Sequence, residues 1–158
     1  MKAEEIYNTL KAKFPDSTVS FTTDEFTDPF ATVKADDLKR LALFLRDDPK
    51  LDFDYLACLS GMDYKDSFGV VYHLYSVNLK HRFVVKVMLD RENPTIPSVE
   101  RIWKTANWHE REAYDMFGIN FEGHPNLIRI LCCYDWEGYP LRKDYKVQEE
   151  YHGTRVPE

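Results

Sequence analysis

Residues 109–115 hold the densest group of side chains that could do chemistry: the run His109-Glu110-Arg111-Glu112, followed by Asp115. A zinc-hydrolase helix needs two histidines four residues apart with a glutamate after the first, and alanine at position 113 removes the second histidine. A helix would place Glu112 on one face with His109 or Asp115, which is compatible with a carboxylate metal site. The same residues could instead form a solvated face with an Arg111–Asp115 ion pair, or a buried ion-pair network at a protein–protein contact.

A second group of candidate residues lies in the Gly/Pro-rich segment 118–145. It contains Gly123-His124-Pro125, Arg129 and Arg142-Lys143-Asp144. The sequence has no GxGxxG or GxxxxGK[ST] loop and no GxSxG elbow, so it predicts neither a nucleotide site nor a serine-hydrolase site. The motifs alone therefore indicate a binding domain without a complete set of catalytic residues.

The three cysteines are Cys58, which stands alone, and the adjacent Cys132 and Cys133. This spacing gives neither a CxxC ligand pair nor a disulfide framework, and an iron–sulfur cluster normally takes four thiolates. We therefore expect three reduced thiols. His73 and His81 fall at strand or turn positions, where we expect packed or solvated side chains.

Composition narrows the function classes further. The 158 residues carry a net charge of -6, which argues against binding to nucleic-acid phosphates. Aromatic residues make up 15% of the chain and require burial in a core or against a partner. No apolar run approaches the ~20 residues of a membrane-spanning helix, and the N-terminal residues lack the apolar region of a secretory signal.

The first 95 residues alternate between helix-like and strand-like patterns. Apolar spacing predicts a helix from Ala3 to Phe14 that Pro15 ends, and a second helix that Asp36 caps and Pro49 stops. Strands are expected at 18–23, 30–34, 53–62, 70–78 and 82–90, with a turn at Asp28-Pro29. The order αββαβββ predicts an α+β domain of two layers, with a mixed sheet of about five strands and the helices on one face.

Residues 91–118 are expected to join this domain to a tail. We predict a loop over 91–97, a short helix that Ser98 caps and that extends through Trp103, and a second helix over 108–117. Asn107 would cap the second helix with Glu110 in a capping box, and Gly118 would end it. These elements place a domain boundary after residue 118, followed by an extended Gly/Pro-rich tail over 119–158. This tail is too irregular to form its own core, so it must pack on this domain or on a partner.

The stretch from Trp103 to Tyr145 resembles the 30 kDa subunit, designated C, of proton-pumping NADH–quinone oxidoreductase (respiratory complex I). The pieces that carry the resemblance follow one another over about 40 residues: Glu110-Arg111-Glu112, Asp115-Met116-Phe117-Gly118, Gly123-His124-Pro125, Arg129-Ile130-Leu131 and Pro140-Leu141-Arg142-Lys143-Asp144-Tyr145. The sequence departs from the family pattern in two places, the pair Cys132-Cys133 and Tyr139, and neither is expected to carry chemistry.

The resemblance implies a structural subunit of the hydrophilic arm with no catalytic residue, flavin, iron–sulfur cluster, quinone or metal of its own. Its implied partners are the large quinone-site subunit (D) and the cluster-bearing subunit (B), and its membrane association, on the cytoplasmic side of the bacterial inner membrane, would come only through the complex. The residues expected at the partner interface are Glu110, Arg111, Glu112, Asp115, His124, Arg129, Arg142, Lys143, Asp144 and Tyr145.

Two other functions compete with this one. The first is the equivalent subunit of a membrane-bound hydrogenase or formate hydrogenlyase complex. The second is a stand-alone metal-dependent hydrolase that uses Glu110, Glu112, Asp115 and His124.

The segment from Pro140 to Glu158 combines arginine and tyrosine without helical or strand periodicity, so we expect it to be loosely packed in the free chain and extended against the large quinone-site subunit.

Overall fold

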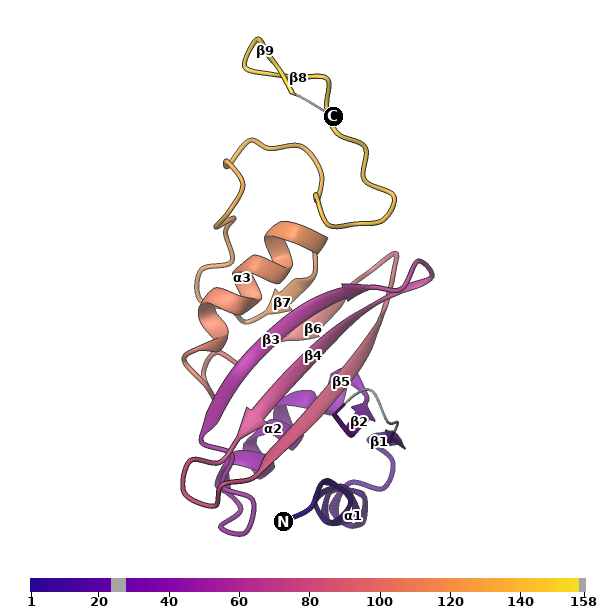
Figure 1. Ribbon diagram of the computed structural model, residues 1–158, viewed down its shortest axis with the longest axis vertical. Coiled ribbons are helices and arrows are strands. Elements are labelled where there is room, and N and C mark those ends of the chain that lie inside the picture. The colour runs from indigo at the N-terminus through magenta and orange to yellow at the C-terminus, as the bar shows by residue number, and fades with distance from the viewer. Residues whose placement is uncertain (24–27, 157–158) are drawn as a thin grey trace.

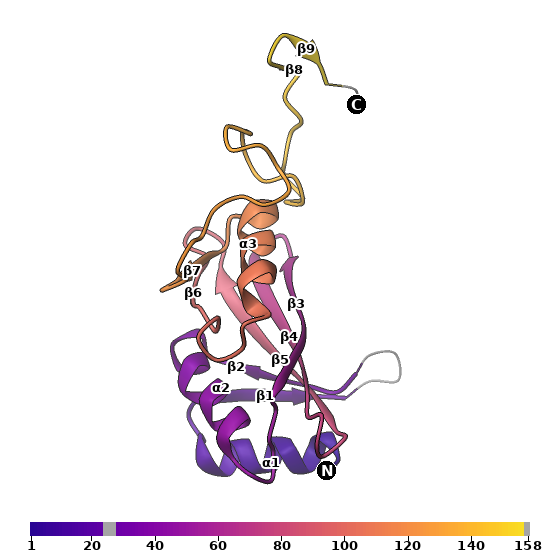
Figure 2. The same ribbon diagram turned by 90° about the vertical axis from the view of Figure 1, so that its left-hand side faces the viewer.

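A five-stranded sheet with helices against one face forms the body of the protein (Figures 1 and 2). The computed structural model describes residues 1–23 and 28–156. The helices are α1 (Ala3–Lys13), α2 (Leu38–Asp47) and α3 (Ala106–Phe117). The strands are β1 (Thr18–Thr22), β2 (Phe30–Val33), β3 (Tyr55–Asp63), β4 (Ser67–Tyr75), β5 (Arg82–Asp90), β6 (Thr95–Pro97), β7 (Asn120–Glu122), β8 (Glu150–Tyr151) and β9 (Thr154–Arg155).

The strand order in the main sheet is β1-β2-β5-β4-β3. The central strand β5 pairs in parallel with β2, and all other neighbouring pairs are antiparallel. A parallel pair requires a crossover connection, which here consists of α2 and the hairpin β3–β4. The predicted α+β class, the mixed five-stranded sheet and the extended C-terminal segment are confirmed.

Buried side chains at every second position of the strands form the core of the domain. Phe83, Val85, Val87 and Leu89 of β5 are buried and lie opposite buried residues of β4 in register, from Leu74 to Phe68. Side chains at period two share one face of a strand, so both strands bury the same face. The helices cover that face with apolar stripes: Ile6 and Leu10 from α1, and Leu38, Leu41, Ala42 and Leu45 from α2.

Several details of the N-terminal half differ from the sequence prediction. The strands expected at 53–62 and 70–78 span Tyr55–Asp63 and Ser67–Tyr75. Residues Ala35–Asp37 form a single 3-10 turn, so Asp36 does not cap α2, which begins at Leu38 without a side-chain cap. The expected strand at 18–23 ends at Thr22, and the turn predicted at Asp28-Pro29 belongs to a connection whose residues 24–27 lie outside the described residues.

The prediction for residues 91–103 is largely wrong. Thr95–Pro97 is strand β6, which pairs in parallel with β7, a segment too distant in sequence to be anticipated. Residues 98–103 form turns and no helix: the amides of Ile102 and Trp103 both donate to the carbonyl of Val99. The Ser98 hydroxyl accepts from the Glu100 amide, as a cap would, but it also donates to Glu110, which lies on α3.

Helix α3 begins at Ala106, so Asn107 lies inside the helix and the predicted capping box does not form. Gly61 of β3 leaves room for the helix, because a Cβ there would come within 2.7 Å of the Phe117 ring. Gly118 ends the helix as predicted, in the left-handed conformation with φ of 72°. Ile119 and Phe121, just beyond the expected domain boundary, are buried in the same core.

Candidate functional site

Helix α3 and the segment 123–145 bring the ten predicted interface residues to one end of the domain. Figure 1 shows α3 beside the upper part of the sheet, next to β3 and away from α1 and α2, and the chain that follows extends above the sheet. Most of these side chains are bonded within the chain, and the bonds divide them into four groups.

Glu110 is a buried carboxyl group with no basic partner among the described residues. It accepts from the Ser98 hydroxyl at 2.6 Å and from the Val99 amide at 2.8 Å, and it thereby ties α3 to the turn that precedes it. Burial raises the pKa of Glu110 to about 7, and Glu100 adds to the rise, although the bonds from Ser98 and Val99 oppose it. This carboxyl group therefore holds its proton up to neutral pH.

Asp115, also buried, organises the loop that follows β7. Its Oδ2 accepts from the amides of residues 130, 131 and 132 at 2.7–2.9 Å, and its Oδ1 accepts from Arg129 at 2.7 Å. Burial alone would raise the pKa of Asp115, but Arg129 and the three amides hold it below the ordinary range. The Arg111–Asp115 pair considered from the sequence does not form, because Arg129 takes that place.

Two arginines bind backbone carbonyl groups of the same loop. Arg111 donates to the carbonyl oxygens of Ile128 and Arg129, each at 3.1 Å. Arg129 donates to those of Trp136 and Gly138 at 2.9 and 2.8 Å. The backbone amides and carbonyls of an irregular segment need hydrogen-bond partners outside a helix or sheet. Here the two guanidinium groups bind carbonyls of the loop and the Asp115 carboxylate binds its amides.

The run Arg142-Lys143-Asp144-Tyr145 is held against the domain. Arg142 donates to the Phe117 carbonyl at 2.7 Å, and the Lys143 amide donates to Asp63 at 2.8 Å. Arg91 lies between Asp63 and Asp144, at 2.8 and 2.9 Å. Residues 141–144 are therefore bonded to the domain, contrary to the expectation of a loosely packed segment from Pro140.

Asp63 and Arg91 were not singled out in the sequence analysis. Burial opposes ionisation of Asp63, but Arg91 and the amides of Lys143 and Lys65 bring its pKa down to about 2. Only the position of Asp63 at the end of a predicted strand marked it, and that signal does not identify a long-range partner. Beyond residue 145 the chain extends away from the sheet to the hairpin β8–β9 (Figure 2). Tyr151 and His152 of this hairpin bond Asp135, each at 2.7 Å.

The arrangement does not form a metal centre. His124 uses both ring nitrogens, because Nε2 donates to the Asn107 carbonyl and Nδ1 accepts from the Asn126 amide. Glu112 is exposed, and Glu110 and Asp115 are occupied as described. Within residues 1–23 and 28–156, no group of three His, Cys, Asp or Glu side chains could hold a metal ion, so the hydrolase alternative is not supported.

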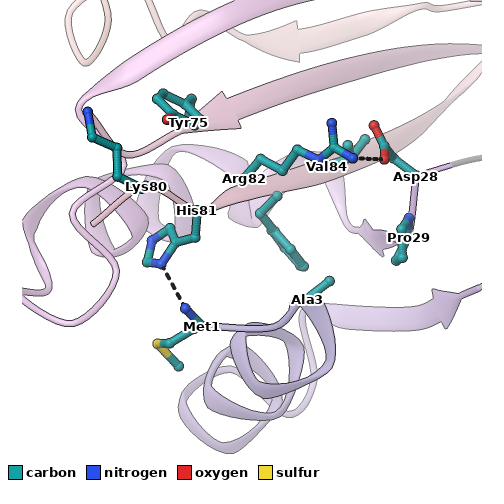
Figure 3. A pocket seen from close by; sticks show the side chains of 10 residues that line it. Met1, Ala3, Asp28, Pro29, Tyr75, Lys80, His81, Arg82 and Val84 are labelled. Atoms are coloured by element: carbon teal, nitrogen blue, oxygen red, sulfur yellow. Dashed lines mark hydrogen bonds and ion pairs between the residues drawn. The ribbon is translucent and has the colours of Figure 1, made fainter. Parts of the chain in front are cut away.

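A cavity of about 380 Å³ lies at the opposite end of the molecule, between the start of α1 and β5 (Figure 3). Several of its polar groups are bonded. His81 is packed, donating from Nε2 to the Leu51 carbonyl at 2.6 Å and accepting from the Met1 ammonium at 3.3 Å. Arg82 pairs with Asp28 at 3.0 Å. Among the described residues that line the cavity, these bonds join no nucleophile to a base, which a catalytic site would require.

Residues 31–151 match the family described as the respiratory-chain NADH dehydrogenase 30 Kd subunit. The chain is 54% identical to the NADH-quinone oxidoreductase subunit designated C of Chlorobium phaeobacteroides, over 96% of this chain and 93% of that one. It is 53% identical to the subunit of the same name from Chloroherpeton thalassium, over 98% of this chain and 65% of that one.

Two solved structures resemble the fold. The first is a trypsin-resistant fragment of Nqo5, with a TM-score of 0.69 and 30% identity, covering 80% of this chain and all of the fragment. The second is a chain in an archaeal respiratory membrane complex, the membrane-bound sulfane sulfur reductase, with a TM-score of 0.73 and 26% identity over 90% of this chain and 85% of that one. None of the helices in the described residues is long and apolar enough to cross a membrane.

Proposed function

The chain belongs to the family of the 30 kDa subunit of respiratory-chain NADH dehydrogenase, and from this premise we propose that it is a structural subunit of the hydrophilic arm of a proton-pumping NADH–quinone oxidoreductase. In this role it supports electron transfer from NADH to quinone by holding other subunits in place, without a catalytic centre, cofactor or metal of its own. The 54% identity to the NADH-quinone oxidoreductase subunit from Chlorobium carries the proposal.

The internal bonding of the candidate residues fits a scaffolding role. Acidic and basic side chains that could have formed a reaction centre instead bind backbone groups and one another, as Asp115 and Arg129 do. We propose two roles for the ten residues: Glu112, Lys143 and Asp144 contact the partner, and the other seven hold the surface in shape.

The proposed partners are the large quinone-site subunit (D), which would lie against the tail over 119–158, and the cluster-bearing subunit (B). The proposed location is the cytoplasmic side of the bacterial inner membrane, through the complex and not through a segment of this chain. A different membrane-bound respiratory complex is less well supported, because the identity to the chain of the archaeal sulfane sulfur reductase complex is 26%, against 54% to the NADH-quinone oxidoreductase subunit.

Replacing Arg111 by alanine tests this function. Arg111 loses two bonds to the loop carbonyls, so the amount of assembled complex should fall more than the NADH–quinone turnover per assembled complex. Arg101→Ala is the matched control, because Arg101 is an exposed arginine just before α3. Normal assembly with lost turnover would contradict a purely structural role.

Purification of the tagged wild-type chain under native conditions tests the partners. The quinone-site and cluster-bearing subunits should co-purify with it in equal amounts, together with NADH–quinone reductase activity. Co-purification with the proteins of a hydrogenase, and without that activity, would favour the alternative complex.

A further inference from the structure

A single buried carboxylate joins three parts of the chain that lie far apart in sequence. Asp63, at the end of β3, has a side chain that is only 2% exposed. It accepts from the guanidinium of Arg91, just after β5, and from the amide of Lys143, each at 2.8 Å. Arg91 also pairs with Asp144 at 2.9 Å. We call Asp63, Arg91 and the segment 141–144 that they hold the ionic latch.

The segment 141–144 also binds the end of α3. The Leu141 amide donates to the Met116 carbonyl at 3.1 Å, and the Arg142 guanidinium donates to the Phe117 carbonyl at 2.7 Å. The last carbonyls of a helix have no partner within the helix, and a cation beside them is favourable. Residues 141 and 142 therefore provide hydrogen bonds that α3 cannot form within itself.

Aromatic rings hold the two arginines of this region. The Phe68 ring of β4 is fully buried, and the guanidinium groups of Arg91 and Arg142 lie 4.7 and 4.8 Å from its centre. Arg142 also lies 4.6 Å from the centre of the Tyr139 ring. A cation over an aromatic face is attracted to it, and more strongly where water is excluded. These contacts attach the latch to a strand inside the main sheet.

The latch is separate from the apolar core. Within residues 1–23 and 28–156, the buried apolar side chains lie between Ile6 and Phe121, and Leu141 is 54% exposed. Residues 141–144 are neither helix nor strand. A segment that buries little apolar surface opens at a lower free-energy cost than the whole domain. The latch can therefore open while the sheet stays folded.

We infer that Asp63 and Arg91 are positioning residues for the partner contact: they fix residues 141–144 on the domain, so that Lys143 and Asp144 are presented in one arrangement before the partner binds. The inference rests on the proposed function, because Lys143 and Asp144 are the residues proposed to contact the partner. Neither Asp63 nor Arg91 needs to touch the partner itself, and neither belongs to the ten predicted interface residues.

Replacing Asp63 by alanine in the full-length chain tests the latch, and Arg91→Ala is a second variant that removes both ion pairs. In the wild type, the amides of Leu141 and Lys143 should exchange hydrogen at least about tenfold more slowly than unprotected amides. In both variants they should exchange nearly as fast as unprotected amides, whereas the amides of Val70 and Tyr72, in the middle of β4, should stay strongly protected.

Recovery of the tagged chain in the assembled complex tests the positioning role. With the latch open, the partner must order the segment 141–144 itself, which weakens binding by about tenfold or more. The amount of either variant recovered in the complex should fall by that order. Asp66→Ala is the matched control, because Asp66 is an exposed aspartate in the turn between β3 and β4 and should assemble normally.

Three results would overturn the inference: unchanged exchange at Leu141 and Lys143 in both variants, loss of protection throughout β4, or normal recovery of a variant whose latch is open. The first would show that the latch does not depend on the ion pairs, and the second that it cannot open separately. If the wild-type chain joins no complex, the proposed function and the positioning role fail together, while hydrogen exchange still decides whether the latch exists.

Discussion

Replacing the buried Glu110 by glutamine should stabilise the domain at alkaline pH and remove a large part of its pH dependence. In the folded chain, burial raises the pKa of Glu110 from its ordinary value of 4.5 to about 7. The folded state therefore retains a proton that the unfolded chain releases from about pH 4.5 upward. Stability linked to this proton is fully present below pH 4.5, decreases as the pH rises and is lost above about pH 7.

The magnitude follows from the difference between the two pKa values and is about 3 kcal/mol, a large fraction of the stability of a small domain. Glutamine has nearly the same shape. Its carbonyl oxygen can still accept from the Val99 amide, and its amide can donate to the Ser98 oxygen, so both contacts survive without a charge. The substitution should therefore leave stability near pH 4.5 almost unchanged and increase it at pH 8.

Urea unfolding of the wild type and Glu110→Gln, followed by circular dichroism at several values between pH 4.5 and 8, measures the effect. The difference between the two proteins should grow by about 3 kcal/mol over this range. Glu112→Gln is the control, because it makes the same chemical change on the exposed face of the same helix. A difference for Glu110→Gln that stays constant within about 1 kcal/mol from pH 5 to 8 would refute the reasoning.

Three further predictions concern the fold around the site. Asp115→Ala should lower the free energy of unfolding, measured with urea, by about 3–5 kcal/mol, because Arg129 loses its partner and three amides lose their acceptor. A decrease below about 1 kcal/mol would contradict the role of Asp115. Tyr72→Phe should leave stability unchanged or raise it by about 1 kcal/mol, because the buried hydroxyl has no hydrogen-bond partner among the described residues, and a clear loss would show that it has one. Removing residues 146–158 should change the free energy of unfolding by less than about 1 kcal/mol but weaken binding to the complex, whereas unfolding of the truncated chain would place this segment in the core.

Local pattern in the sequence determined the body of the fold. The period-two alternation in β5 and the helical stripe of α2 predicted both elements and their buried faces. Gly118 predicted the end of α3, because a left-handed residue is needed there and glycine adopts that conformation without strain. The short motifs that follow one another over about 40 residues, from Trp103 to Tyr145, indicated the family.

Only the tertiary structure decided which hydrogen-bond and ion-pair partners the site residues have. Glu110 could have formed a capping box within its own helix, but burial brought Ser98 and Val99 to it and a different pair of bonds formed. Asp115 could have paired with Arg111, four residues before it, yet Arg129 and three loop amides took its oxygens. These partners lie 11 to 17 residues away in sequence, and the contact of Asp63 with Lys143 spans 80. Sequence spacing predicts neighbours on one element, whereas the choice among competing partners depends on which of them the folded chain shields from water.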